Sequence, residues 1–173
     1  MKKSNINPMP EYFDRYINLV PDIEIIEAFD NSIEQLNSID RDLFTKLDGK
    51  RYAPDKWTVK DIIQHSIDTE RILSYRALRF ARNDDTPLHG FDENSYAVNT
   101  TANDRTIISL LQELILVRGT TKMMFENFNH PMLLRKGIAS NKEISVLALG
   151  FTIIGHQLHH LRIIEQRYIP LIK

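Results

Sequence analysis

Two histidines near the end of the chain, His156 and His160, are spaced so that they could share one metal ion. Residues four apart on an α-helix project from the same face, about one turn from each other. The segment that leads into them, residues 145–154, is apolar on nearly every side, which indicates a central helix rather than a half-exposed one. Imidazole groups in such surroundings need polar partners, and a bound ion would be one.

A third histidine, His65, lies two turns inside another predicted helix and could complete a three-nitrogen site with His156 and His160. Three protein ligands leave a fourth position for water or substrate, which is the layout of a catalytic metal site rather than a closed structural one. Imidazole suits divalent transition metals, and we expect zinc or nickel. The same spacing also occurs among hydrogen-bonded core or surface histidines, so the pattern by itself leaves both interpretations open. His159 adds a further alternative, since it could replace a ligand or simply be exposed.

The residue types exclude several other chemistries. The chain has no cysteine, which removes disulfides, cysteine zinc clusters, iron-sulfur centres and a cysteine nucleophile. Zinc proteases of the His-Glu-x-x-His kind need a glutamate after the first histidine, and here that position is Gln157. No Gly-x-Ser-x-Gly turn supports a serine hydrolase. Histidine, carboxylate and hydroxyl groups remain, and no residue could be assigned a catalytic or substrate-binding role.

Composition predicts one globular domain over residues 1–173, opened by a lead-in at 1–21. The hydrophobic content of 42% is ordinary for such a domain, and the longest apolar run is too short to span a membrane. The 22 basic and 23 acidic side chains are interspersed, which argues against a nucleic-acid partner. No apolar segment follows Lys2 and Lys3, so we expect a cytoplasmic protein with a small-molecule substrate.

Helical periodicity predicts an all-α fold, a four-helix bundle with a long crossover loop between helices two and three. Helix one should run from Asp22 to residue 48, with Ile39 taking the apolar position that Asp40 interrupts. Helix two should begin at the Thr58 capping box and end near residue 82. Helix three should span about residues 104–128. Helix four should open at 140–143, where serine and glutamate have capping-box spacing, and end before position 170.

The crossover, residues 83–103, has no periodic pattern and is long for a compact domain. Such a segment is either a lid or binding element, with His89, Phe91 and Tyr96 able to reach a site, or a surface connection in which the two aromatic residues are packing anchors.

Three charged residues on the predicted helices have two interpretations each. Asp61 and Asp68 share the helix face of His65, so they could orient its ring or take protons, although solvated surface charges are the more common outcome. Arg118 interrupts the apolar stripe of helix three, where a long side chain most often reaches out to water but could instead hold an acidic substrate group.

Three segments occur together in a recognisable order and spacing: residues 57–65 with Asp68 and Glu70, residues 90–94 with Tyr96, and residues 155–164. In these segments the chain resembles the DinB-like superfamily, the DNA-damage-inducible bundle proteins, over about residues 22–168. The resemblance implies a four-helix bundle that holds a divalent metal through three histidines, and these fall on His65, His156 and His160.

The resemblance leaves the activity less fixed. Some relatives are thiol transferases or isomerases that use bacillithiol, mycothiol or glutathione, and the lack of cysteine fits an external low-molecular-weight thiol. A metal would stabilise the bound thiolate near neutral pH. Hydrolysis through a metal-bound hydroxide is one alternative. A non-catalytic metal-binding or structural bundle is another, and we expect the protein to form a homodimer.

Overall fold

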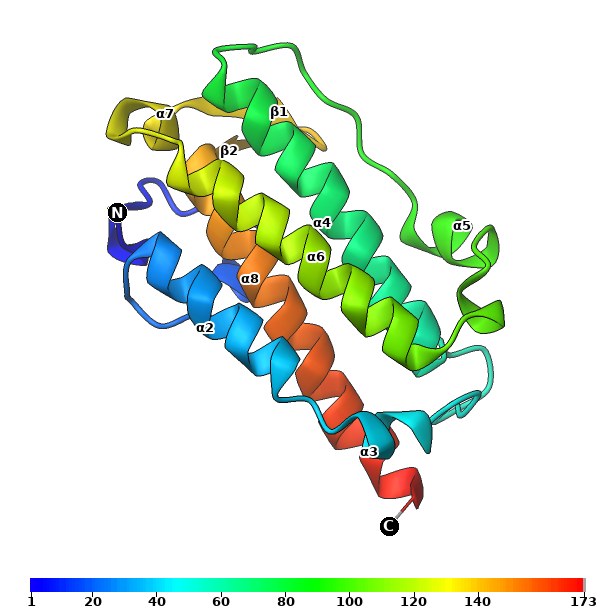
Figure 1. The fold of residues 1–173 in the computed structure, drawn as a ribbon. Coiled ribbons are helices and arrows are strands. Elements are labelled where there is room, and N and C mark those ends of the chain that lie inside the picture. The colour runs from blue at the N-terminus through cyan, green and yellow to red at the C-terminus, as the bar shows by residue number, and fades with distance from the viewer. Residues whose placement is uncertain (173) are drawn as a thin grey trace.

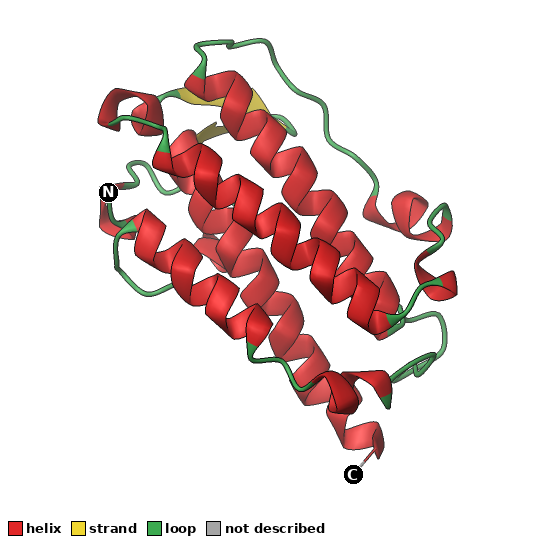
Figure 2. Cartoon of the chain, in the orientation of Figure 1, coloured by secondary structure: helices red, strands yellow, loops and turns green. Residues whose placement is uncertain are grey.

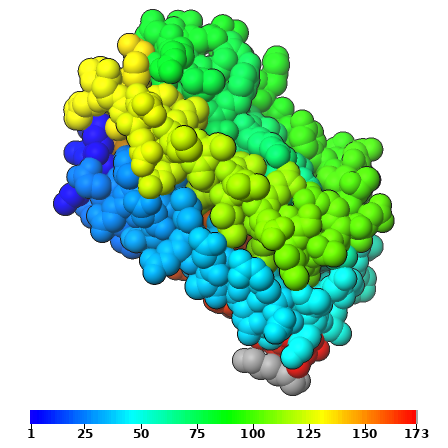
Figure 3. Space-filling view, in the orientation of Figure 1, coloured from blue at the N-terminus to red at the C-terminus, as the bar shows by residue number. Residues whose placement is uncertain are grey.

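Four long helices form the body of the protein in a computed structural model that describes residues 1–172. They are α2 (Ile25–Asn37), α4 (Val59–Ala81), α6 (Ile107–Glu126) and α8 (Val146–Ile163). Around the bundle, α4 packs against α8 and α6, while α2 closes the ring between α6 and α8 (Figure 1). In the space-filling view of this face, α2 and α6 lie over α8 and leave little of it visible (Figure 3). The central position expected for the last helix is confirmed.

The crossover between α4 and α6 makes these two neighbouring helices parallel. It runs back along the whole length of the bundle and contains the short helix α5 (Glu93–Val98) and a 3-10 turn (Ala102–Asp104), which the sequence did not predict (Figure 1). Near the starts of both helices Arg105 donates to the Gln64 side chain at 3.2 Å, and further along each the Arg71 guanidinium on α4 meets the Glu113 carboxylate on α6 at 2.8 Å. The four long helices therefore run down, up, up and down in chain order instead of alternating in direction (Figure 1).

The N-terminal segment packs on the body of the bundle. A 3-10 turn (Lys3–Asn5) is followed by helix α1 (Asp14–Ile17), which lies against α8. Phe13 and Ile17 are buried there in the apolar cluster that also contains the first half of α8, and this burial stabilises the packing of α1.

The first predicted helix is in fact two, and the prediction for Asp40 is wrong. Helix α2 ends at Asn37, and α3 (Arg41–Thr45) follows after a break. Asp40 is the N-cap of α3, where its carboxylate accepts a hydrogen bond from the Leu43 backbone N–H at 2.9 Å. An aspartate that satisfies a free backbone donor favours a new helix start over an uninterrupted turn. Asp22 does not cap α2 either, since its carboxylate accepts the Ser4 backbone N–H.

The predicted start of the last helix is also wrong. Helix α6 gives way to α7 (His130–Leu134) and then to an antiparallel hairpin of β1 (Lys136–Ala139) and β2 (Lys142–Ser145), the strands drawn in Figure 2. Ser140 and Asn141 form its turn with φ angles of 51° and 62°, a left-handed conformation that no helix start uses. Ser145 is the real N-cap, since its Oγ accepts the Ala148 N–H at 3.1 Å. Beyond α8 a π-helical segment (Ile164–Tyr168) and a 3-10 turn (Ile169–Ile172) continue past position 170.

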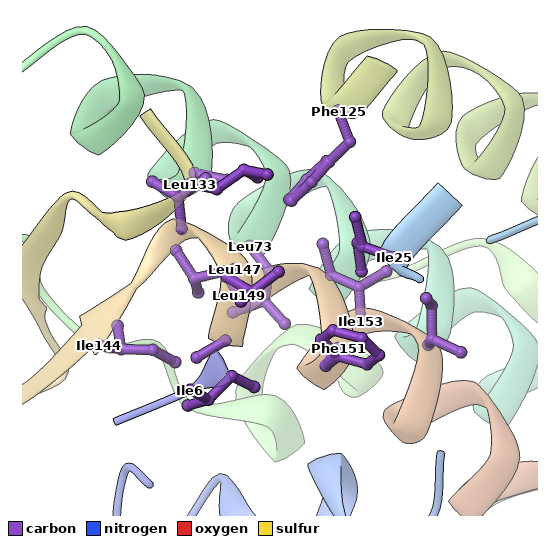
Figure 4. Packing of buried hydrophobic residues seen from close by; sticks show 14 of the residues in the cluster. Ile6, Ile25, Leu73, Phe125, Leu133, Ile144, Leu147, Leu149, Phe151 and Ile153 are labelled. Atoms are coloured by element: carbon purple, nitrogen blue, oxygen red, sulfur yellow. The ribbon is translucent and has the colours of Figure 1, made fainter. Parts of the chain in front are cut away.

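The core consists of two apolar clusters with buried polar residues between them. One surrounds the first half of α8 and is seen from close by in Figure 4. The other joins the first halves of α4 and α6 to the end of α8. Among the residues labelled in Figure 4 are Ile25, Leu73, Phe125, Leu147, Phe151 and Ile153.

Arg118 lies between the two clusters and does not reach water. Its side chain is 1% exposed and makes a bidentate ion pair with Glu70, with Nε–Oε1 and Nη2–Oε2 distances of 2.9 Å. Its Nη1 also donates to the Ser32 hydroxyl at 2.7 Å and to the Gln157 side-chain oxygen at 2.5 Å. The second interpretation of this arginine, a contact to a substrate, does not hold either, because its donors are used inside the core.

Among residues 1–172, none of the helices has both the length and the apolar character needed to cross a bilayer.

Candidate metal centre

The position of His65 is fixed by the start of α4. Thr58 and Asp61 form the predicted capping box: the Asp61 carboxylate accepts the Thr58 backbone N–H at 2.8 Å, and the Thr58 hydroxyl accepts the Asp61 N–H at 3.1 Å. Asn103 at the end of the crossover donates to the other Asp61 oxygen at 2.8 Å. Because these hydrogen bonds fix the start of α4, they also fix the direction in which the His65 side chain projects, one to two turns further along the helix.

The other two histidines come from α8, which runs antiparallel to α4. The Nε2 atom of His156 lies 3.0 Å from that of His65 and 3.1 Å from that of His160. One ring nitrogen from each of the three lies within 4.8 Å of the others. The predicted site residues are thus brought together in space, although 91 positions separate His65 from His156.

The geometry and the donor types fit a divalent metal ion. The Nε2 atom of His156 has one lone pair or one proton, so it cannot make a full hydrogen bond to both neighbours at once. Two nitrogens bound to one tetrahedral ion at about 2.0–2.1 Å stand roughly 3.3 Å apart, close to the observed separations. The Nδ1 atom of His160, on the other side of the ring from its Nε2 atom, is buried with no hydrogen-bond partner among residues 1–172. Three converging imidazoles of this kind could hold an ion such as zinc or nickel.

Burial keeps these imidazoles neutral. Desolvation, with a smaller contribution from His159, lowers the pKa of His65 to about 4. Burial and the neighbouring imidazoles lower the pKa values of His156 and His160 well below the usual value. A neutral imidazole offers the lone pair that a metal ion requires, so the site is ready to bind at neutral pH.

Aromatic rings hold the imidazoles in place. The Trp57 ring packs on His65 with centroids 4.8 Å apart. Tyr16 from α1 meets the edge of His156 at 5.2 Å and of His159 at 5.4 Å. His159 therefore contacts the outer side of the cluster and contributes no nitrogen to the group of three.

Neither of the two acids considered as possible partners of His65 is hydrogen-bonded to its ring. Asp61 belongs to the helix cap, and Asp68 accepts a hydrogen bond from the Gln64 side chain at 2.9 Å. The group next to the ring is the Thr69 hydroxyl, 3.5 Å from the His65 Nδ1 atom. It lies one turn further along the same helix face, so the spacing of four residues was the signal that could have identified it.

A cavity of about 360 Å³ opens beside His65 and His156, between α4 and α8 and beneath the N-terminal segment and the crossover. Its size is at the small end of the range for small-molecule sites. A second cavity, of about 230 Å³, borders His160. The lining of the larger cavity includes residues from five parts of the chain, among them Tyr12, Tyr16, Thr69, Arg76, Phe91 and Ser140.

Of the three crossover residues that could reach a site, His89, Phe91 and Tyr96, only Phe91 does so. Phe91 lines the large cavity and packs on Tyr96 with ring centroids 5.0 Å apart. Tyr96 and His89 are exposed, and neither side chain lines this cavity. The segment therefore covers the site through Phe91 and anchors itself through the aromatic pair. Sequence reasoning did not identify Arg76 or Ser140: Arg76 lines the cavity from α4, but its acceptors come from the folded crossover and hairpin, and Ser140 lies in the hairpin turn.

The fold and the histidine cluster define a helical bundle with a candidate metal centre, and the comparisons with known proteins agree. The chain matches the DinB superfamily over residues 24–164 and belongs to this family. It is similar in structure to YfiT from Bacillus subtilis, described as a probable metal-dependent hydrolase with an unusual four-helix bundle topology. That likeness has a TM-score of 0.68 at 16% identity and covers 96% of this chain and 90% of the other, so it shows the fold. No curated protein matches the chain.

Proposed function

We propose that this protein is a metal-dependent enzyme that transfers a low-molecular-weight thiol to an electrophilic small molecule. The observation that supports the proposal most directly is that two of the three clustered imidazoles, His65 and His156, lie on the wall of the 360 Å³ cavity. A structural site would use four protein ligands and be closed to small molecules. Here His65 and His156 face a space in which a further ligand of the ion could enter.

The chain's own residues would each have a defined part in this reaction. His65, His156 and His160 would bind the ion through their neutral Nε2 atoms, and Thr69 would orient the His65 ring. The apolar side chains of the cavity, such as Phe13 and Leu73, would exclude water and pack on the electrophile. A divalent ion held by these three imidazoles would lower the pKa of a bound thiol or water and so would supply a nucleophile near neutral pH. With no cysteine in the chain, the thiol must come from outside.

Metal-dependent hydrolysis is the second candidate, and the description of YfiT is the observation that favours it. The same three nitrogens could serve a water molecule instead of a thiol. Within the described part of the chain, residues 1–172, the only carboxylate in the lining of the large cavity is that of Glu93, which is exposed on α5. A hydrolase would need this group, or a histidine released from the cluster, to take up the proton.

Cobalt substitution separates these possibilities. Cobalt-loaded protein should change its visible absorption when mercaptoethanol is added, because a thiolate bound to the ion gives a new charge-transfer band. The variant His159→Ala should behave like the unmodified protein, whereas His160→Ala should lose the cobalt spectrum. An unchanged spectrum at saturating thiol would contradict the transferase proposal. Cleavage of an activated ester in that case would favour the hydrolase, and its absence would favour a non-catalytic metal-binding bundle.

A further inference from the structure

The large cavity has one polar end at His65 and His156, and Arg76 forms a second one. This arginine on α4 is 3% exposed and lines the same cavity as His65 and His156. Its Nη2 group donates to the His89 backbone oxygen at 2.8 Å and to the Ser140 hydroxyl at 3.2 Å. The crossover and the hairpin turn therefore hold the guanidinium in one orientation.

Among residues 1–172, the charge of Arg76 has no counter-ion. Both of its acceptors are neutral, and no carboxylate of residues 1–172 lies within 4.0 Å of it. The other deeply buried arginine, Arg118, is by contrast fully paired with Glu70. A buried guanidinium without a carboxylate raises the free energy of the folded protein. Such a cost is typical of a binding site that is completed by its ligand.

The free donors of Arg76 are accessible from the cavity. Its Nε and Nη1 groups have no acceptor among residues 1–172, yet neither of them is sealed off from small molecules. These N–H groups diverge within the guanidinium plane, so each of them can donate one hydrogen bond to an oxygen of an anion, while both hydrogens of Nη2 are used by His89 and Ser140.

The other charges around the cavity do not compensate Arg76. The Lys142 ammonium group is already paired with the Glu11 carboxylate at 3.0 Å. The Glu93 carboxylate is exposed on α5 and lies more than 4.0 Å from the guanidinium. One positive charge is thus left over, which suits a single carboxylate better than a phosphate dianion.

The two polar ends lie at a fixed spacing on one helix. Arg76 follows His65 by eleven residues, which places both within roughly 20° of the same direction around α4. The rise over eleven residues is about 16 Å, and an arginine that leans toward the helix start reduces the gap to roughly 10 Å. A ligand that touches both ends must be elongated.

We propose that Arg76 binds the carboxylate of an elongated organic acid whose opposite end reaches the three-histidine site. This inference rests on the proposed function in one respect, namely that the large cavity holds the substrate or the thiol. It adds the chemical class of that molecule: an anion with its negative charge roughly 10 Å from the reactive atom.

Two thiols of equal length test the inference. Mercaptohexanoate and mercaptohexanol differ only in the carboxylate, and their affinities for zinc-loaded protein can be measured by isothermal titration. We expect the acid to bind the unmodified protein about tenfold more tightly than the alcohol. Arg76→Gln should lose this preference and keep the affinity for mercaptohexanol, which also shows that the site remains folded. Arg76→Lys should keep a part of it, since the charge stays but the guanidinium donors held by His89 and Ser140 are lost.

Arg71→Gln is the matched control. It removes one positive charge from the same helix, but on another face, and its partner Glu113 keeps a second ion pair with Arg105 at 2.6 Å. This variant should retain the full preference for the acid. An equal loss in both variants would mean that net charge, and not Arg76, sets the preference, and would overturn the inference.

A metal-free measurement separates this inference from the proposed function. Hexanoate should bind the chelator-treated protein more tightly than hexanol, in titrations followed by NMR, and Arg76→Gln should remove the difference. If hexanoate binds in this way but no thiol reaches the metal, the inference stands and the transferase proposal fails. If thiols bind without any preference for the acid, the proposed function stands and the inference fails. Equal binding of hexanoate by unmodified protein and Arg76→Gln, or no binding at all, also overturns it.

Discussion

Gly155 on α8 lies directly against the backbone of Tyr16 on α1: a Cβ atom on this glycine would stand 2.0 Å from the Tyr16 carbonyl oxygen. Only hydrogen fits in that space. The contact sets how closely α1 approaches α8, and with it the edge contact between the Tyr16 ring and His156, the next residue along. The N-terminal segment thereby becomes part of the wall of the metal site.

Replacing this glycine should separate the two elements. Gly155→Ala should lower the free energy of unfolding by at least about 2 kcal/mol, because rigid backbone has to move to admit the methyl group. Gly119→Ala on α6 is the control, since a Cβ there meets nothing within 4 Å. It should raise stability by about 0.5–1 kcal/mol through helix propensity. Urea unfolding of both variants measures the difference, and a loss of similar size in the two would contradict the packing argument.

The metal site should depend on three histidines and not on the fourth. Protein purified without a histidine tag and incubated with zinc or nickel should contain close to one ion per chain, measured by plasma mass spectrometry. His65→Ala, His156→Ala and His160→Ala should each lose most of it, because two imidazoles hold such an ion far less tightly. His159→Ala should keep it, since His159 lies outside the group of three. Unmodified protein that takes up no metal would make the cluster purely structural.

The buried pair of Arg118 and Glu70 should be far more sensitive to substitution than a surface pair. Glu70→Gln should cost about 3–5 kcal/mol, because it leaves the Arg118 charge buried and uncompensated. The double change Glu70→Leu with Arg118→Met should cost much less, since it removes both charges together. Arg71→Ala, which breaks an exposed pair, should change stability by less than about 1 kcal/mol. Denaturant unfolding gives the free energy of unfolding of all three variants. A double variant less stable than Glu70→Gln would argue against this account.

Metal-free protein should lose stability in mild acid. The pKa of His65 falls from 6.5 in an exposed chain to about 4 in the folded protein, because burial disfavours the charged imidazole. Between these values the unfolded chain takes up a proton that the folded chain does not. The free energy of unfolding should therefore be unaffected by His65 above pH 6.5 and decrease as the pH falls toward 4.

His65→Gln should make this pH dependence shallower in the metal-free protein. Saturation of the unmodified protein with zinc should raise the free energy of unfolding most at neutral pH, because few protons compete for the imidazoles there. Thermal unfolding in the presence and absence of a chelator over this range provides the measurement. A variant with the same slope as the unmodified protein would show that His65 is not buried in its neutral form.

The local pattern was sufficient for the elements that carry the site. Apolar residues at spacings of three and four reveal which face of a helix is buried, whatever it packs against, so the long helices and the start of α4 at Thr58 could be predicted. The spacing of His156 and His160 likewise placed two ligands on one helix face. The same local rules failed where two local structures compete: Ser140 to Glu143 has a capping-box pattern, but pairing between β1 and β2 makes Ser140 and Asn141 a hairpin turn.

The amino-acid sequence by itself determined the helical class of the fold, the family and the three histidines that could bind metal. Only the tertiary structure decided what lies around them. The crossover makes α4 and α6 parallel neighbours, and in this arrangement Arg118 on α6 pairs with Glu70 on α4. The hairpin turn lies beside Arg76, where Ser140 accepts its hydrogen bond. Periodicity could not predict these contacts, because it records that a side chain is buried but not which distant segment buries it.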